Sequence, residues 1–292
     1  MEFLQQVING LSLGFVYALI AIGYTMVYGI IGLINFAHGD IFMVAAYFGF
    51  LVSTYFKLSF IPTLLIAMIG AALLGMLIEK IAYKPLRNSP KISLLITAIA
   101  ISLLLENVVQ KIMGSQSQTY PDKLFPQHMI KLGQLTIDDR KLIIILISIV
   151  LVIILQYIVF KTKTGKAMRA ASFDKDAAAL MGINVDSIIS ITFAIGSALA
   201  GAAGVLVGIL YSSIDPYMGI MPGLKAFVAA VLGGIGIIPG ALAGGILMGL
   251  AETFSKVYIS SSYSDAIAFS ILIIILIVKP SGLLGKKTSE KV

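Results

Sequence analysis

Long apolar segments alternate with short polar ones along nearly the whole chain. The apolar segments lie at about 7–28, 32–56, 60–82, 92–113, 142–160, 187–210, 223–238, 240–258 and 265–279. A helix needs about 20 apolar residues to cross roughly 30 Å of hydrocarbon, so most of these segments can span a bilayer. We expect helices because a lipid-exposed backbone must satisfy its own hydrogen bonds, and the alternating pattern of a membrane barrel is absent.

This pattern predicts an all-α, polytopic membrane protein with 8–9 transmembrane helices, forming a single domain over residues 1–292. The segment 223–238 decides between the two counts. It is short and rich in glycine, and it either spans the membrane or re-enters it.

Basic residues indicate the orientation of the chain. Thirteen of the 21 lysines and arginines fall in three polar segments, 80–91, 161–175 and 279–291. Short loops rich in Lys and Arg stay in the cytoplasm, so nine spans place the N-terminus outside and the C-terminus inside. The long loop 161–186 is then cytoplasmic and the loop 114–141 extracytoplasmic. With this placement, the formal net charge of +7 indicates topology rather than a nucleic-acid partner.

Composition excludes several classes of function. The chain is 59% hydrophobic and 12% charged, which is too apolar for a soluble domain. It has no cysteine and only two histidines, His38 and His128, so we expect no disulfide, no multi-histidine metal site and no cofactor. No P-loop and no H-E-x-x-H motif is present, and we expect no enzyme activity. The N-terminus has no signal-peptide pattern, so its apolar run is interpreted as the first span.

One weak hydrolase pattern, Gly10-Leu-Ser12-Leu-Gly14, lies at the start of the first span. An intramembrane protease would need His38 beside Ser12. Small residues at helix–helix contacts explain the same pattern more simply.

Polar and charged residues interrupt the apolar segments at a few positions. Three of these residues, Asn35, His38 and Asp40, have two interpretations. They form a turn between the first two spans, or they form part of a transport pathway. The second interpretation follows because an ionisable group inside a membrane is energetically unfavourable and usually has a function. Glu252 lies deeper in a span and is a candidate pathway residue. Glu79 and Glu106 lie near span ends, where we expect them to extend toward water.

Two stretches are rich in small residues. The run from Gly196 to Gly204 predicts close helix packing. The run from Gly233 to Gly240 contains both glycine and Pro239, which break helices, and so Gly233 and Gly234 are candidate gate residues.

The loop 161–186 contains a short, well-capped helix. Asp174 is a suitable N-cap, Asp176 lies in the first turn, and Gly182 is placed to end the helix. A helix of about seven residues is marginal alone, so its apolar side chains need a partner surface. That surface is the bundle itself or another protein. Alternatively, this segment lies on the membrane and its lysines contact anionic lipid.

Several motifs resemble one family of transport proteins. Asp176-Ala-Ala-Ala-Leu-Met-Gly182 resembles the cytoplasmic E-A-A…G loop of ABC importer permeases, although many relatives have proline or glutamate where Asp176 stands. Four further stretches resemble the branched-chain amino acid and sugar permeases: Asn35-Phe-Ala-His-Gly, Thr164-Gly-Lys-Ala-Met-Arg-Ala, Phe193-Ala-Ile-Gly-Ser-Ala-Leu-Ala-Gly and Gly233-Gly-Ile-Gly-Ile-Ile-Pro-Gly. The similarity is closest to the first of the two paired permeases of branched-chain amino acid importers.

The resemblance implies a type II-like permease in the bacterial plasma (inner) membrane. Its partners would be a second homologous permease, two ABC ATPase subunits that hydrolyse ATP, an extracytoplasmic substrate-binding protein and membrane lipid. The cargo would be leucine, isoleucine or valine. The ATPase-coupling residues would be Asp176, Ala177, Ala178, Leu180, Met181 and Gly182. The alternative function is an ion-coupled secondary amino-acid transporter with Glu252 as its coupling carboxylate.

Overall fold

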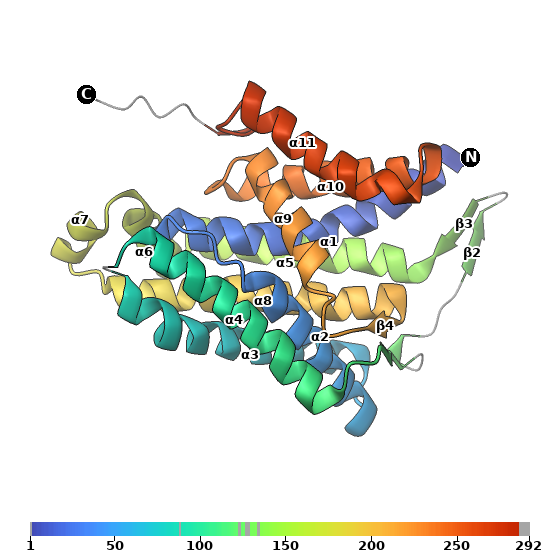
Figure 1. The fold of residues 1–292 in the computed structure, drawn as a ribbon, viewed down its shortest axis with the longest axis horizontal. Coiled ribbons are helices and arrows are strands. Elements are labelled where there is room, and N and C mark those ends of the chain that lie inside the picture. Colours follow the sequence, from blue (N-terminus) through green and yellow to red (C-terminus); the bar gives the residue numbers. More distant parts are fainter. Residues whose placement is uncertain (1, 88, 122–123, 126–128, 133–134, 286–292) are drawn as a thin grey trace.

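The computed structural model describes residues 2–87, 89–121, 124–125, 129–132 and 135–285, so that His128, Lys286, Lys287 and Lys291 lie outside the described residues. Helices make up most of the fold (Figure 1). The elements follow in the order α1 (Glu2–Ile31), α2 (His38–Tyr55), α3 (Phe60–Ile78), η1 (Glu79–Tyr83), η2 (Lys84–Leu86), α4 (Lys91–Met113), β1 (Gln118–Thr119), β2 (Met129–Leu132), β3 (Leu135–Asp138), α5 (Asp139–Lys161), α6 (Lys163–Phe173), α7 (Lys175–Leu180), α8 (Val185–Tyr211), β4 (Ser213–Ile214), α9 (Ile220–Gly233), α10 (Ile238–Tyr258), η4 (Ser261–Tyr263) and α11 (Ser264–Val278).

Seven helices in the described part of the chain are long and apolar enough to cross a membrane, which confirms a helical, polytopic membrane protein. The other two expected spans correspond to shorter or more polar helices. The first of these, α2, begins at His38 and not near residue 32. The second, α9, has 14 residues and rises only about 21 Å.

The expected end of the 223–238 segment is wrong. Its helix stops at Gly233, because Gly234 (φ +105°) and Gly236 (φ +91°) adopt a backbone conformation that turns the chain into α10.

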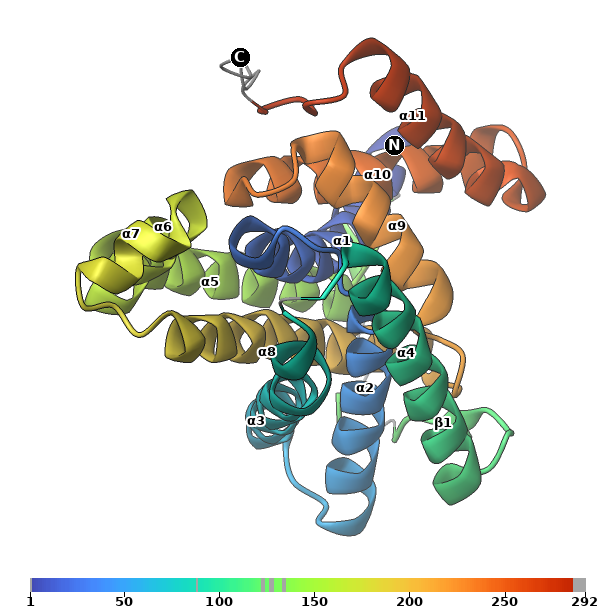
Figure 2. The same cartoon turned by 60° about the vertical axis from the view of Figure 1, so that its left-hand side comes forward.

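Two helices form the centre of the bundle. In α1 and α8, 78% of the most apolar stretch is buried inside the protein, compared with 22% in α4 and 11% in α11. Figure 2 shows α1 and α8 surrounded by other helices and α11 at the edge. The outer faces of α4, α5 and α11 are therefore available for lipid or for another subunit.

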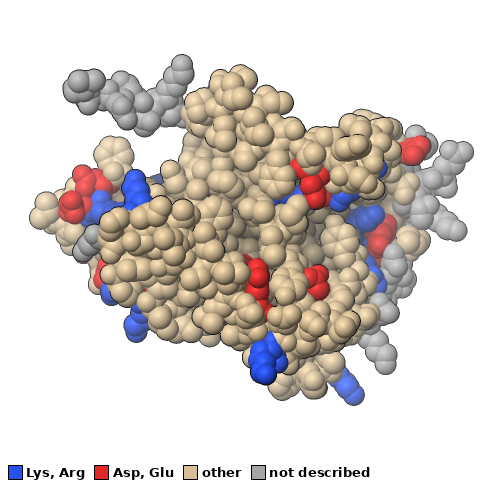
Figure 3. All heavy atoms as spheres, in the orientation of Figure 1, with Lys and Arg blue, Asp and Glu red and all other residues tan. Residues whose placement is uncertain are grey.

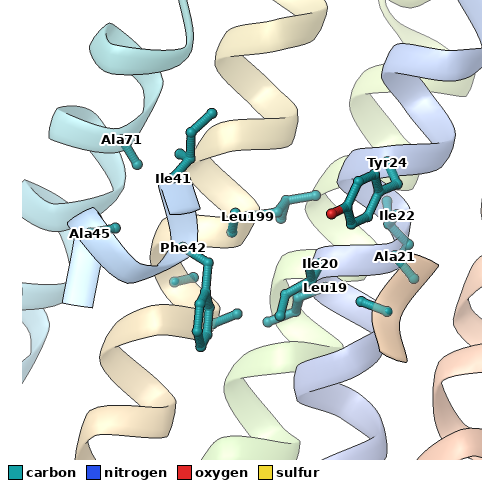
Figure 4. Close-up of a cluster of buried hydrophobic side chains, with 14 of the residues drawn as sticks. Leu19, Ile20, Ala21, Ile22, Tyr24, Ile41, Phe42, Ala45, Ala71 and Leu199 are labelled. Atoms are coloured by element: carbon teal, nitrogen blue, oxygen red, sulfur yellow. The ribbon is translucent and has the colours of Figure 1, made fainter. Parts of the chain in front are cut away.

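Small residues bring the central helices close together, as the sequence predicted. Gly14 of α1 packs directly on Gly249 of α10, and a Cβ atom on Gly249 would overlap the Gly14 backbone. Gly204 of α8 likewise packs against the carbonyl of Phe42 in α2. The hydrophobic effect does not drive helices together in lipid, because lipid tails are as apolar as the side chains. Close approach stabilises the packed helices instead through van der Waals contacts. Figure 4 shows Ile20 of α1 and Phe42 of α2 in the buried cluster of apolar side chains.

The described parts of the three basic segments, 80–87, 161–175 and 279–285, gather at one end of the bundle, here called the α7 end. Lys84 pairs with Asp186 at the start of α8 (2.8 Å), and Arg87 pairs with the same carboxylate. The chain after α11 returns to this end, where the Leu283 amide donates to the Leu232 carbonyl (2.8 Å). Figure 1 places α6 and α7 at the same end, and the N-terminus with strands β2 and β3 at the opposite one, here called the hairpin end.

Short strands at the hairpin end are an addition to the all-α expectation. β2 pairs with β3, and β1 pairs with β4, both antiparallel. Tyr120, just after β1, anchors this loop to the bundle, because its hydroxyl donates to the Ala46 carbonyl of α2 (3.1 Å).

Candidate functional site

The polar segment around His38 turns into the bundle instead of forming a surface turn. α1 ends at Ile31, and Gly32 (φ +74°) follows it. Asn35 is only 2% exposed and accepts a hydrogen bond from the Tyr83 hydroxyl (2.7 Å). His38 then packs beside Gly23 of α1. Gly23 lies eight residues before the end of α1, which corresponds to about 12 Å along the helix axis. α2 therefore starts inside the bundle.

α9 starts at the same depth. Gly219, just before α9, packs on the backbone of Gly39 in α2, and Gly223 also faces Gly39. Side chains larger than hydrogen at these glycines would overlap the facing backbone. The starts of α2 and α9 thus meet inside the protein. Figure 2 shows the two helices with α4 beside them. Neither start has a side-chain cap.

A cavity of about 300 Å³ lies beside this meeting point, between α1, α2, α4 and α9. Asp40 and Glu106 line it and are 3% and 7% exposed. Ser102 of α4 donates a hydrogen bond to Asp40 Oδ2. Glu106 does not extend to water as the sequence suggested, because its position on α4 faces α2 and α9 across this cavity.

His38 is 1% exposed and packs edge-on against the Tyr24 ring (4.8 Å between centroids). It is not near Ser12, since Ser12 lies eleven residues before Gly23 on α1, about 16 Å away along the axis. The Ser12 hydroxyl donates instead to the Asn9 carbonyl (2.9 Å). The structure therefore does not bring together the pair that a protease would need.

Glu252 of α10 is the centre of a buried polar network. It accepts hydrogen bonds from the Tyr17 hydroxyl (2.6 Å), from Lys225 Nζ of α9 (2.8 Å) and from Lys256 Nζ (2.6 Å). Lys225 also pairs with Asp265 of α11 (2.7 Å). The two carboxylates and the two ammonium groups balance in charge. The network joins α1, α9, α10 and α11, and Glu252 is paired within it.

Gly233 and Gly234 form the tight turn between α9 and α10 at the α7 end. Gly233 packs on Gly240 so closely that neither position can hold a side chain without movement. The Leu284 amide donates to the Gly233 carbonyl (3.1 Å). This turn is therefore held by the segment that follows α11.

α6 and α7 project from the bundle at the α7 end (Figure 1). Asp174 caps α7 as predicted, accepting from the amides of Asp176 and Ala177 (2.9 Å each). Gly182 (φ +80°) ends it, and its amide donates to the Ala179 carbonyl (2.9 Å). The six-residue helix from Lys175 to Leu180 confirms the expected length.

The apolar residues of α7 divide between two surfaces. Ala178 is buried against the bundle (4% exposed). Leu180 (89% exposed) and Met181 (83%) point away from it, and Phe173 just before α7 is 94% exposed. Leu180, Met181 and Phe173, here called the α7 apolar patch, have no partner surface among the described residues.

Two contacts of Arg169 fix α6 to the bundle. Arg169 of α6 donates to the Val159 carbonyl of α5 and lies over the Phe160 ring (5.4 Å to the centroid). Partial burial and the nearby Arg87 lower the pKa of Lys175 at the start of α7.

A partly buried polar cluster joins the start of α8 to the segment after α3. Arg87 pairs with Asp186 and with Glu79, and the Ser190 hydroxyl of α8 donates to Glu79 (2.5 Å). Glu79 is fully buried, so it does not extend to water as the sequence suggested. Arg87 is eight residues from Glu79 in the chain, but Ser190 is 111 residues away, and no local sequence pattern identifies it as a partner.

Comparisons with known proteins agree with this architecture. The family model for the branched-chain amino acid transport system permease component matches residues 6–276. The chain belongs to this permease family.

Two full-length relatives are closely similar to this permease. The high-affinity branched-chain amino acid transport permease LivH of Salmonella typhimurium is 44% identical, with 99% of this chain and 98% of the relative covered. The permease BraD of Pseudomonas aeruginosa is 41% identical, with 100% and 98% covered.

More distant relatives extend the comparison. LivM of Escherichia coli, also a branched-chain amino acid transport permease, is 25% identical over 94% of this chain and 68% of its own. Among solved structures, PsaBC of Streptococcus pneumoniae has the same fold, with a TM-score of 0.50, 14% identity, and 94% and 91% of the two chains covered.

Family membership and the spanning helices together make this permease a multi-pass protein of the bacterial inner membrane. Its relatives are transport subunits rather than enzymes. Sequence reasoning missed Ser102, Gly219 and Gly223 as neighbours of Asp40. A serine and two glycines give no signal by themselves, and only the meeting of α2, α4 and α9 brings them together.

Proposed function

We propose that this permease is the transmembrane subunit of an ATP-driven importer that moves leucine, isoleucine and valine into the cell. The observation that carries the proposal is the 44% identity to LivH over nearly the full length of both chains. A shared sequence at this level over all spans supports a shared pathway as well as a shared fold.

The proposed complex contains a second homologous permease, two ABC ATPase subunits and an extracytoplasmic substrate-binding protein, in a type II-like arrangement. The similarity to LivM supports pairing with a second type of permease. The exposed apolar faces of α4, α5 and α11 offer surface for that pairing and for lipid. In this arrangement the α7 end is cytoplasmic, which agrees with its basic residues.

The α7 apolar patch is the proposed contact for an ATPase subunit. Asp176, Ala177, Leu180, Met181 and Gly182 would face the ATPase, whereas Ala178 would hold α7 on the bundle. Motion of the ATPase would pass through α7 to the start of α8, because only four residues, 181–184, separate the two helices. The Asp186–Arg87–Glu79 contacts would carry it onward to the end of α3.

The remaining candidate residues have distinct places in this scheme. Asn35, His38 and Asp40 lie where α2 starts inside the bundle, beside the proposed pathway. Gly233 and Gly234 form the turn at which α9 would move relative to α10. Glu252 would hold α9 against α10 and α11, so its three donors argue against a free coupling carboxylate.

The test is purification of the tagged chain from its native membrane in mild detergent, followed by identification of the proteins that remain bound. We expect a second permease and an ABC ATPase in roughly equal amounts. In proteoliposomes, the purified complex should import leucine only when ATP and the loaded binding protein are both supplied. Import driven by an ion gradient without an ATPase would contradict the proposal.

A further inference from the structure

The cavity beside the starts of α2 and α9 contains two carboxyl groups whose bonding is incomplete. Asp40 Oδ1 has no hydrogen-bond partner from another described residue, although Asp40 is 97% buried. Glu106 makes no hydrogen bond and no ion pair with the residues that the structure describes. Both side chains lie on segments that cross the apolar part of the protein.

Carboxyl groups in this position favour a cation as their partner. A carboxylate held away from water without a partner is strongly unfavourable, and in membrane proteins these residues pair with a counter-ion or mark the path of a substrate. No lysine, arginine or histidine is among the described residues that line the cavity. Within this described lining the two carboxyl groups have no cationic partner, and a cationic group of a bound molecule would supply one.

The rest of the cavity wall has a different chemistry. Gly39 at the start of α2, and Gly219 and Ile220 at the start of α9, line one part of it, and neither helix start has a side-chain cap. Helix N-termini favour negatively charged groups. Ile99, Leu103 and Leu224 line another part.

The volume of about 300 Å³ is at the lower limit for small-molecule sites. Ile99 and Leu103 are 47% and 53% exposed, so one side of the cavity opens at the protein surface. Figure 3 shows acidic atoms near the middle of this face, among residues that are mostly uncharged.

The geometry points to a transit site for one zwitterionic amino acid with an apolar side chain. Asp40 and Glu106 bind its ammonium group, the starts of α2 and α9 face its carboxylate, and Ile99, Leu103 and Leu224 contact its side chain. The second permease closes the open side. This inference rests on the proposed import function and assigns the groups that contact cargo inside the membrane.

The test uses the complete complex of permeases, ATPases and binding protein in proteoliposomes, with leucine as the probe. Uptake is measured per ATP hydrolysed for the wild type and for the variants Asp40→Asn and Glu106→Gln. We expect each variant to reduce leucine uptake about tenfold or more, since each loses a charged hydrogen-bond partner of the cargo. Glu2→Gln, an exposed change in the first turn of α1, is the matched control and should transport normally.

Charge-conserving variants separate cargo binding from folding. Asp40→Glu and Glu106→Asp keep the negative charge and should retain most of the uptake, while assembly and stimulation of the ATPase by the loaded binding protein stay normal in all variants.

Three results would overturn the inference. Normal uptake by both Asp40→Asn and Glu106→Gln would show that the carboxylates do not contact cargo. Loss of the second permease during purification of these variants would show that they pair with that subunit. Failure of the wild-type complex to import leucine at all would overturn the proposed function and this inference with it.

Discussion

Replacing Leu180 with alanine tests whether the α7 apolar patch binds an ATPase. Leu180 is 89% exposed, so its side chain contributes little to folding, and the change should alter the free energy of unfolding by less than about 0.5 kcal/mol. Alanine also has the highest helix propensity, so α7 itself should not weaken.

The expected loss of ATPase binding follows from the atoms removed. Leucine to alanine removes three carbons, each worth about 0.8 kcal/mol when fully buried in an interface. The total of about 2.4 kcal/mol corresponds to a roughly 50-fold increase in Kd, at 1.4 kcal/mol per factor of ten. Met181→Ala should weaken binding to a similar extent, since Met181 is 83% exposed on the same surface.

The assay is a titration of the purified ATPase subunit onto the permease pair held in lipid nanodiscs. Leu146→Ala is the control, because Leu146 is 61% exposed on α5, far from α7 in the sequence and within an apolar span. Its Kd should match that of the wild type. A change of less than threefold for both Leu180→Ala and Met181→Ala would refute the assignment of this patch to the ATPase.

Three further changes test the supporting structure. Gly182→Ala has room for its Cβ but must keep a φ of +80°, which costs about 1–2 kcal/mol and should speed hydrogen exchange of the α7 amides while the bundle stays unchanged. Glu252→Gln breaks a buried ion network at a cost of about 3 kcal/mol and should lower the Tm in detergent, with Glu2→Gln as the unshifted control. Abolished transport with an unchanged Tm would instead favour an ion-coupling role for Glu252. Gly249→Leu forces α10 away from Gly14 of α1, and we expect it to reduce the yield of folded protein more than Leu247→Ala, at an exposed position on α10.

Much of the α7 region could be predicted from the sequence because its signals are local. Asp174 and Gly182 lie at the two ends of one short helix, and both act on backbone groups within three residues of themselves. The orientation of the helix was not predictable. Ala178 faces the bundle and Leu180 faces outward because α7 follows α6, which the Arg169 contacts hold on α5.

The polar residues inside the membrane were identified from sequence, but their roles were not. Glu79 and Glu106 were both expected to extend toward water, yet the first is paired and buried and the second lines a cavity. The partners of Glu252 include Tyr17, which is 235 residues away in the chain. A charged residue in an apolar segment predicts that a partner is present, but only the packing of the helices determines which residue that partner is.

The sequence by itself determined the membrane class, the position of most helices and the family. These depend on hydrophobicity, on small residues at helix contacts and on motifs, all of which are local properties of the sequence. The tertiary structure alone decided that α2 and α9 start inside the bundle, where Gly39 meets Gly219 and Asp40 meets Ser102. An apolar helix can start at several depths within the bundle. The depth at which α2 and α9 start is set by their contacts with distant helices rather than by their own residues.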